Sequence, residues 1–126
     1  MRVRVSEADV HYSGNLVAGA YTLKLFGDLA TELAIRHDGD EGLLVAYESV
    51  HFLKPVYGGD FLEVTGEIVE TGNTSRKIIF QAQKVIQSKD VGPFDSSAEY
   101  LDPPEVVVKA VGTIVVPKDK QRKRKR

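Results

Sequence analysis

The stretch His11–His37, HYSGNLVAGAYTLKLFGDLATELAIRH, decides the fold. It begins with polar and glycine-rich residues and continues into a segment whose apolar residues recur at helical spacing. From Leu16 to about Arg36 these apolar residues cover most of the circumference, which indicates a helix buried on several sides. The sequence HDGDEG at 37–42 follows as a stop and turn signal.

The segments around this helix are predicted as β-strands. Alternating and β-branched patterns favour strands at 2–5, 43–53, 60–70, 76–87 and 106–116, with a hairpin turn at 71–74. The proline-containing stretch 88–105 is predicted as a long polar loop. A helix that is apolar almost all round needs a curved sheet on one side and a partner subunit on the other. We therefore expect an α+β fold in a homo-oligomer.

Length and composition narrow the class of protein. The 126 residues suit one domain, which we place at 1–117. The chain has no cysteine, and its three histidines lack ligand spacing, so we expect neither a disulfide nor a metal site. No apolar run approaches the ~20 residues that span a bilayer. The N-terminus lacks the pattern of a signal peptide, so we expect a cytoplasmic protein with no membrane partner.

The charge is divided unevenly along the chain. The last nine residues, KDKQRKRKR, hold seven of the 17 Lys and Arg residues and one of the 18 Asp and Glu residues. The body at 1–117 therefore has 10 basic and 17 acidic residues, a formal charge of −7. We expect residues 118–126 to be a disordered, solvated tail, or alternatively an arm that meets phosphates. An acidic body argues against nucleic acid as a partner.

The element order, together with GNLVAGAYTLKLF at 14–26 and FLKPVYGGD at 52–60, resembles the hot-dog fold. In this fold a curved antiparallel sheet wraps around one long central helix, and its members include acyl-CoA thioesterases and hydratases. The segments 3–33, 38–44, 73–77 and 115–121 are similar to the 3-aminobutyryl-CoA ammonia-lyases of anaerobic lysine fermentation. These enzymes are relatives of the β-alanyl-CoA ammonia-lyases.

That resemblance implies a carbon-nitrogen lyase that reversibly eliminates ammonia from 3-aminobutyryl-CoA to give crotonyl-CoA. It implies an acyl-CoA thioester and ammonia as the reacting partners. No separate cofactor is expected, because CoA is part of the substrate. It also implies a homo-oligomer built from hot-dog dimers, with a hexamer as one arrangement.

Such an elimination places negative charge on the thioester carbonyl oxygen. The N-terminus of a helix offers free N–H groups and the positive end of the helix dipole to such an oxygen. We therefore expect the backbone amides of Val17, Ala18 and Gly19 to bind the thioester. The alternative is that the glycines here only allow close packing.

Four side chains are considered for the acid–base chemistry. Glu32 is better explained by pairing with Arg36, so Asp28, His11 and Glu48 are kept as the three candidates. Asp28 lies on the helix, where related thioesterases often carry a working carboxylate. The i, i+4 spacing of Lys24, Asp28, Glu32 and Arg36 equally predicts a solvated ladder of ion pairs. His11 precedes the helix, where a neutral imidazole could take part in proton transfer or simply be exposed.

Glu48 is the third candidate. Strict alternation over 43–53 places it on an apolar face with Leu44, Ala46, Val50 and Phe52. A carboxylate on an apolar face is paired, neutral or used in function. The last expectation concerns CoA, whose phosphates and pantetheine the hairpin segment Asn73, Thr74, Ser75, Arg76 and Lys77 would hold. Its alternative is an ordinary polar hairpin tip.

Two rival functions share most of these features. A hot-dog thioesterase would use the same helix terminus and a carboxylate to hydrolyse the thioester. A non-catalytic module would bind a CoA ester or, through the basic tail, nucleic acid. Release of ammonium, release of free thiol, or neither distinguishes the three possibilities.

Overall fold

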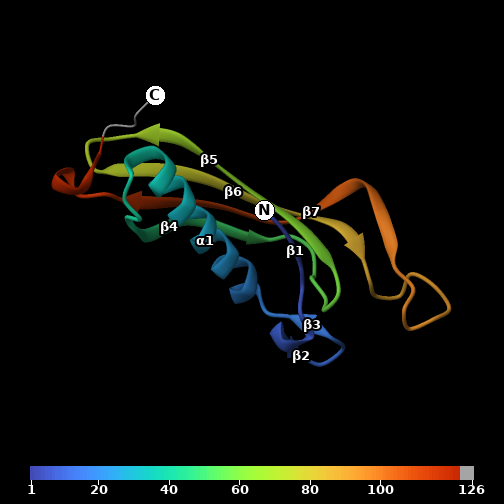
Figure 1. Cartoon of the computed structure of the whole chain (residues 1–126). Helices are drawn as coiled ribbons and strands as arrows, with labels where there is room; N and C mark the ends of the chain where they lie inside the picture. The colour runs from blue at the N-terminus through green and yellow to red at the C-terminus, as the bar shows by residue number, and fades with distance from the viewer. Residues whose placement is uncertain (123–126) are drawn as a thin grey trace.

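A long helix lies across one face of a curved five-stranded antiparallel sheet (Figure 1). The computed structural model describes residues 1–122. Helix α1 spans Gly19–Asp38. The strands of the sheet, in spatial order, are β1 (Arg2–Arg4), β5 (Phe61–Thr71), β6 (Ser75–Gln87), β7 (Glu99–Val115) and β4 (Leu43–Phe52). This arrangement confirms the predicted α+β fold with one central helix.

The core lies between α1 and the concave face of the sheet. Phe26 is fully buried in the middle of the helix and stacks on Phe80 of β6, with ring centroids 5.0 Å apart. The helix packs closely on β5 at Gly66, where an added Cβ would lie 3.0 Å from Leu29. Burial of large apolar side chains, each worth about 1.5–3 kcal/mol, therefore fixes the helix on the sheet.

The chain before the helix is more regular than expected. The polar stretch 6–15, to which the sequence pattern assigns no helix or strand, contains the 3₁₀ turn η1 (Glu7–Asp9) and strand β2 (Val10–Tyr12). Strand β2 pairs with the short strand β3 (Leu16–Val17). The helix therefore starts at Gly19 rather than Leu16, because residues 16 and 17 belong to β3.

The far end of the helix is tied to the hairpin between β5 and β6. Asp38, the last helical residue, forms a two-pronged ion pair with Arg76, and both of its N···O distances are 2.9 Å. Gly39 ends the helix with a φ of 71°, a left-handed conformation that glycine adopts without strain.

The first part of the basic tail is ordered against this end of the molecule. Residues Lys118–Lys120 form the turn η2. The backbone N–H of Arg122 donates to the carbonyl of Asp38, and its guanidinium donates to the carbonyl of Gly39. Cations are favoured at helix C-termini by the helix dipole. The expected disorder from residue 118 onward therefore does not describe 118–122, and residues 123–126 lie outside the described part.

Strand β7 begins seven residues earlier than predicted. Its first residues pair with the end of β6, Glu99 with Gln87 and Tyr100 with Ile86, so only residues 88–98 form the loop. The ladder then skips 101–104 before it resumes at Glu105. The two prolines at 103 and 104 lie in this unpaired stretch, where their missing N–H groups cost no ladder hydrogen bond.

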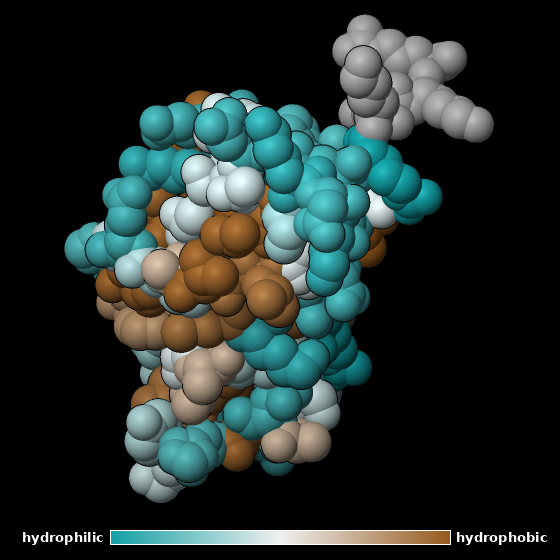
Figure 2. All heavy atoms as spheres, turned by 90° about the vertical axis from the view of Figure 1, so that its left-hand side faces the viewer, coloured by the Kyte–Doolittle hydropathy of each residue, from teal (hydrophilic) through white to brown (hydrophobic). Residues whose placement is uncertain are grey.

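Strand β4 is the open edge of the sheet. It is ten residues long and exposes large apolar side chains, with Leu43 at 71% and Val45 at 56%. Figure 2 looks onto the end of the molecule where α1 ends and β4 begins, and shows a contiguous apolar area within a polar surface. Long apolar edge strands are rarely left uncovered in native proteins.

Candidate active site

An apolar cavity of about 470 Å³ opens beside the N-terminus of α1. One wall is the junction of β3 and α1, and the other is the segment that follows β4. The cavity is lined by Tyr12, Leu16, Val17, Ala18, Gly19, Thr22, Phe52, Leu53, Lys54, Pro55, Val56 and Val108. A concave apolar site with few polar groups is typical of a ligand pocket.

The helix begins at this cavity with two free amide donors, of which Gly19 lines the cavity and Ala20 does not. Gly19 and Ala20 open the helix, so their N–H groups have no intrahelical acceptor. The N-cap residue Ala18 has no side chain that could accept from them. The N–H of Tyr21 is already bonded to the carbonyl of Ala18.

The backbone N–H of Val17 is not free to bind the thioester, contrary to the prediction. Its N–H donates to the carbonyl of Val56 at 2.9 Å, which joins the two walls of the cavity. Ala18 and Gly19 line the cavity as expected. The free N–H groups at the start of the helix are those of Gly19 and Ala20, and Ala20 lies outside the lining. The shift follows from the later start of the helix.

Gly19 also explains the close approach of an aromatic ring. A Cβ added at this position would lie 2.5 Å from Cε1 of Phe52, nearer than two carbons can come. Phe52 lies at the end of β4 and is half exposed. Both expected roles of this glycine therefore apply. Gly19 leaves its amide exposed at the cavity, and its lack of a side chain makes room for the Phe52 ring that shapes the cavity.

A buried ion pair fixes the segment that forms the second wall. The Lys84 ammonium lies 3.1 Å from the Asp60 carboxylate and donates to the carbonyl of Pro55 at 2.9 Å. Asp60 also accepts from the backbone N–H groups of Tyr57 and Ser88. The FLKPVYGGD stretch is therefore held from inside by its own final aspartate and by one lysine of β6.

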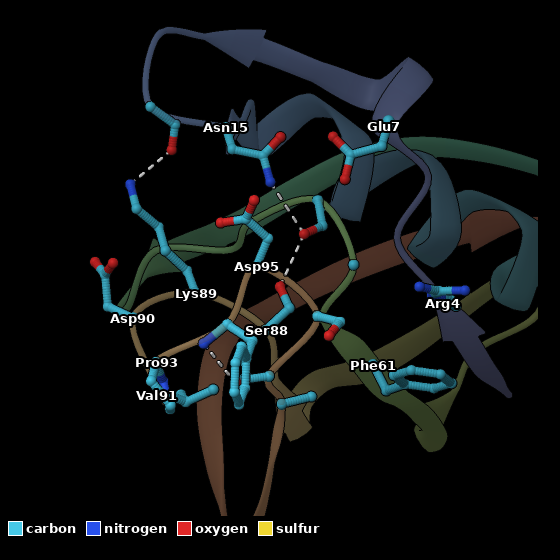
Figure 3. Close-up of a pocket in the computed structure, with 18 residues that line it drawn as sticks. Arg4, Glu7, Asn15, Phe61, Ser88, Lys89, Asp90, Val91, Pro93 and Asp95 are labelled. Atoms are coloured by element: carbon cyan, nitrogen blue, oxygen red, sulfur yellow. Dashed lines mark hydrogen bonds between the residues drawn. The ribbon is translucent and has the colours of Figure 1, made fainter.

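A second, polar cavity of about 660 Å³ lies on the other side of the same segment (Figure 3). Asn15 and Ser88 both donate to the carbonyl of Gly58, at 3.1 and 2.8 Å. Lys89 donates to the carbonyl of Gly14 and lies over the Tyr57 ring at 4.4 Å. The ionisable residues that line this polar cavity are Arg4, Glu7, Lys89, Asp90 and Asp95.

Asp28 and Glu32 do not line either cavity. Asp28 pairs with Lys24 at 3.4 Å and Glu32 with Arg36 at 2.8 Å, and all four side chains are more than half exposed. Asp28 lies nine residues beyond Gly19, about 13 Å along the helix axis. Within one chain the four residues therefore form two exposed ion pairs, as the i, i+4 spacing of the sequence predicted.

Glu48 is not on the apolar face. The pairing of β4 with β7 shifts between Leu44 and Ala46 and again between Tyr47 and Ser49, so strict alternation fails. Tyr47 consequently packs inward against Phe80, while the Glu48 carboxylate pairs with Lys77 at 2.9 Å. That hydrogen bond raises the pKa of Lys77.

His11 lies nearest the apolar cavity among the three acid–base candidates. Its ring meets the Tyr12 ring edge-on, with centroids 4.7 Å apart, and Tyr12 lines the cavity. The His11 side chain is exposed. His11 is therefore next to a residue that lines the cavity but does not line it itself, and Asp28 and Glu48 lie elsewhere.

The hairpin segment predicted to hold CoA lies at the opposite end of the helix. Arg76 joins this tip to Asp38, and Asp38 is about 28 Å from Gly19 along the 20-residue helix. Arg76 itself is 3% exposed and is fully engaged by Asp38 and the carbonyls of Gly72 and Ser75. It is therefore not free to bind phosphates, whereas Asn73, Thr74, Ser75 and Lys77 remain accessible.

Sequence reasoning missed several residues of the site. Thr22 reads as an ordinary helix residue and Lys84 as a surface charge, although both are almost completely buried. Within residues 1–122 there is no group of three or more carboxylate or imidazole side chains that could hold a metal. The same residues contain no helix long and apolar enough to cross a membrane.

Comparisons with known proteins place the chain in a family. The thioesterase superfamily model matches residues 14–79. A 3-aminobutyryl-CoA ammonia lyase from Acetoanaerobium sticklandii is 56% identical over 124 residues, which are 98% of this chain and 97% of that protein. The β-alanyl-CoA:ammonia lyase from Clostridium propionicum superposes with a TM-score of 0.94 at 38% identity, over 100% of this chain and 89% of that one.

A more distant structure shows the fold alone. A hexameric hotdog fold thioesterase from Campylobacter jejuni has a TM-score of 0.73 at 18% identity, over 98% of this chain and 86% of that one. The hot-dog fold expected from the resemblance is therefore confirmed.

Proposed function

The chain belongs to the family of 3-aminobutyryl-CoA ammonia lyases, within the thioesterase superfamily, and we propose that its catalytic site is the apolar cavity beside Gly19. It is a carbon-nitrogen lyase whose substrate is a 3-aminoacyl-CoA. The 56% identity over nearly the whole of both chains carries this conclusion. The two free amides at the start of α1 supply the chemistry that the reaction needs.

The amides of Gly19 and Ala20 bind the thioester carbonyl oxygen. Their donors are fixed before the reaction, so they stabilise the negative charge that develops when the proton on carbon 2 is removed. The C–H bond at carbon 2 and the C–N bond at carbon 3 break, and a double bond forms between these carbons. The amine leaves with a proton as ammonia, and no separate cofactor takes part.

His11 is the acid–base group best placed within one chain. It borders the cavity through Tyr12, and an imidazole exchanges protons near neutral pH. Asp28 and Glu48 would reach this cavity only from another subunit. The same holds for Asn73, Thr74, Ser75 and Lys77 as CoA-binding residues.

A second copy is expected along β4. The outer side of this ten-residue strand has unpaired backbone groups, and its exposed apolar side chains gain by being covered. Pairing of β4 with its counterpart would join two sheets into one. The resemblance to hexameric hot-dog thioesterases supports further assembly of such dimers.

The reaction is tested with purified protein and 3-aminobutyryl-CoA. We expect enoyl absorbance and ammonium to appear together, and crotonyl-CoA with ammonium to give the reverse reaction. Dialysis against a chelator should not change the rate. Free CoA thiol without ammonium would instead identify a thioesterase.

The likeness to the ammonia-lyases of anaerobic lysine fermentation supports a role in that pathway, in the cytoplasm.

A further inference from the structure

The start of α1 is not held by a side-chain cap. Its N-cap residue is Ala18, which forms no side-chain hydrogen bond to the first turn. A serine, threonine, asparagine or aspartate in this place normally bonds an N–H group of that turn and so fixes the helix start. The position of the free Gly19 amide therefore depends on the residues just before the helix.

Those residues are bonded to the second wall of the cavity. The N–H of Val17 donates to the carbonyl of Val56 at 2.9 Å. The N–H of Gly58 donates to the carbonyl of Asn15, and the Asn15 side chain donates back to the carbonyl of Gly58, both at 3.1 Å (Figure 3). Three hydrogen bonds thus join the two stretches of chain. The helix start therefore follows the position of this wall.

The wall in turn is held to the sheet by Lys84 of β6. The Lys84 ammonium donates to the carbonyl of Pro55 at 2.9 Å, directly before Val56 in the chain. The Asp60 carboxylate lies 3.1 Å from the ammonium and accepts from the N–H of Tyr57 at 2.8 Å. Pro55 has no N–H with which to pair as a strand would. A buried side chain from the sheet makes the connection instead.

Stability alone does not account for a buried ion pair at this place. The cost of removing two charges from water often offsets their attraction, and apolar residues of similar volume can replace such pairs without loss of stability. Apolar residues cannot supply direction, whereas an ammonium N–H points at one carbonyl at a fixed distance. The Lys84 hydrogen bond therefore places Pro55, and with it the wall, in one position.

We propose that Lys84, held by Asp60, is a positioning residue of the reaction, which through the carbonyl of Pro55 sets where the Gly19 amide meets the thioester oxygen. The proposal rests on the proposed function, in which that amide stabilises the developing negative charge. From the ammonium to the chain before the helix, the path consists of two hydrogen bonds of 2.9 Å, joined by the peptide unit between Pro55 and Val56. Misplacement of such a group by about 1 Å can cost about 10²-fold in rate.

The test compares Lys84→Met with Asp38→Asn as the matched control. Asp38 belongs to a second buried ion pair, with Arg76, at the opposite end of the same helix. Each variant removes one charge of a buried pair, so both should lose stability. The values of kcat and KM are measured at a temperature at which urea unfolding shows each variant to be folded. Loss of stability as such then acts on both variants alike.

Lys84→Met should lower kcat by about tenfold or more. Its KM should change less than its kcat, because the amide acts mainly on charge that develops in the transition state. Asp38→Asn should keep the wild-type kcat, since it leaves the hydrogen bond from Lys84 to Pro55 in place.

A second readout does not depend on turnover. It is the rate at which the Val17 amide exchanges its hydrogen with solvent, divided by the rate for Phe80 in the middle of β6, both measured by NMR. Phe80 reports opening of the sheet, whereas Val17 reports opening of its bond to Val56. Lys84→Met should raise this ratio by about tenfold or more, and Asp38→Asn should leave it unchanged.

A double variant keeps the test valid should Lys84→Met not fold. Lys84→Met combined with Asp60→Asn leaves no unpaired buried charge, yet it lacks the donor to Pro55 and should show the same two effects. The proposal is overturned if the folded variants keep the wild-type kcat or the wild-type exchange ratio, or if Asp38→Asn lowers kcat equally. A wild-type protein without lyase activity refutes the proposed function instead, and the exchange ratio still tests whether Lys84 holds the helix start.

Discussion

The Lys84 ammonium lies 3.1 Å from the Asp60 carboxylate, and the side chains are 2% and 0% exposed. Removing one member leaves the other charged and buried, which typically costs about 3–5 kcal/mol. Lys84→Met should lower the free energy of unfolding by that amount, as measured in urea. The exposed Arg2–Glu63 pair is the control, and Arg2→Gln should leave the free energy of unfolding nearly unchanged. Equal losses in the two variants would contradict the structural role of the pair.

Tyr47 should make stability depend on alkaline pH. Burial raises the pKa of Tyr47 above its usual value of 10.0, because the interior disfavours the phenolate. The neutral side chain therefore contributes stability in full below the unfolded-state pKa, and this contribution is lost as pH rises through the folded-state pKa. Tyr47→Phe should remove this part of the alkaline decline, as shown by urea unfolding at several pH values.

The same variant tests a hydrogen bond across the oligomer. Within residues 1–122, the Tyr47 hydroxyl is the one buried side-chain polar atom without a partner. Tyr47→Phe should therefore leave stability at neutral pH unchanged or slightly raised. A loss of about 1 kcal/mol or more would mean that another subunit supplies an acceptor.

The acid–base candidates are separated by three conservative changes. His11→Gln should lower kcat by about 10²-fold or more, the usual scale for a proton-transfer group. Asp28→Asn and Glu48→Gln each remove one member of an exposed ion pair and should leave both kcat and unfolding nearly unchanged. An inactive Asp28→Asn beside an active His11→Gln would instead assign the base to a carboxylate from another subunit.

Truncation of the tail distinguishes anchoring from CoA binding. A chain that ends at Pro117 loses the contacts of Gln121 with Asn73 and Val116, and those of Arg122 with the helix end. Its free energy of unfolding should fall by about 1–3 kcal/mol, since each hydrogen bond contributes roughly 0.5–1.5 kcal/mol. A chain that ends at Arg122 keeps these contacts and should unfold like the full chain. If 118–122 also meet CoA phosphates, the shorter chain alone should show a raised KM at low salt.

The sequence predicted the helix and most strands because the apolar residues of each recur at the spacing typical of that structure. The helix over 19–38 and the strands from 43, 61 and 75 onward lie within a residue or a few of the predicted bounds. The side on which Glu48 points could not be read in this way. The pairing of β4 with β7 shifts register at two places, and each shift interrupts the alternation of inward and outward side chains along β4.

The site was predicted only as far as it depends on local structure. The amides at Ala18 and Gly19 follow from the start of a helix, which the sequence marks with glycine and apolar spacing. Thr22 and Lys84 carry no such mark. Lys84 is buried by its contacts with Pro55 and Asp60, and Thr22 lies in the wall of a cavity that it shares with residues 52–56, so both positions become evident only once the chain is folded.

The contact between Gly19 and Phe52 links two positions that are 33 residues apart in the sequence. An alanine at 19 requires the Phe52 ring to move away or a smaller side chain to stand at 52. The shape of this wall of the cavity is therefore set jointly by the two positions, and a change of cavity size is best designed at both of them together.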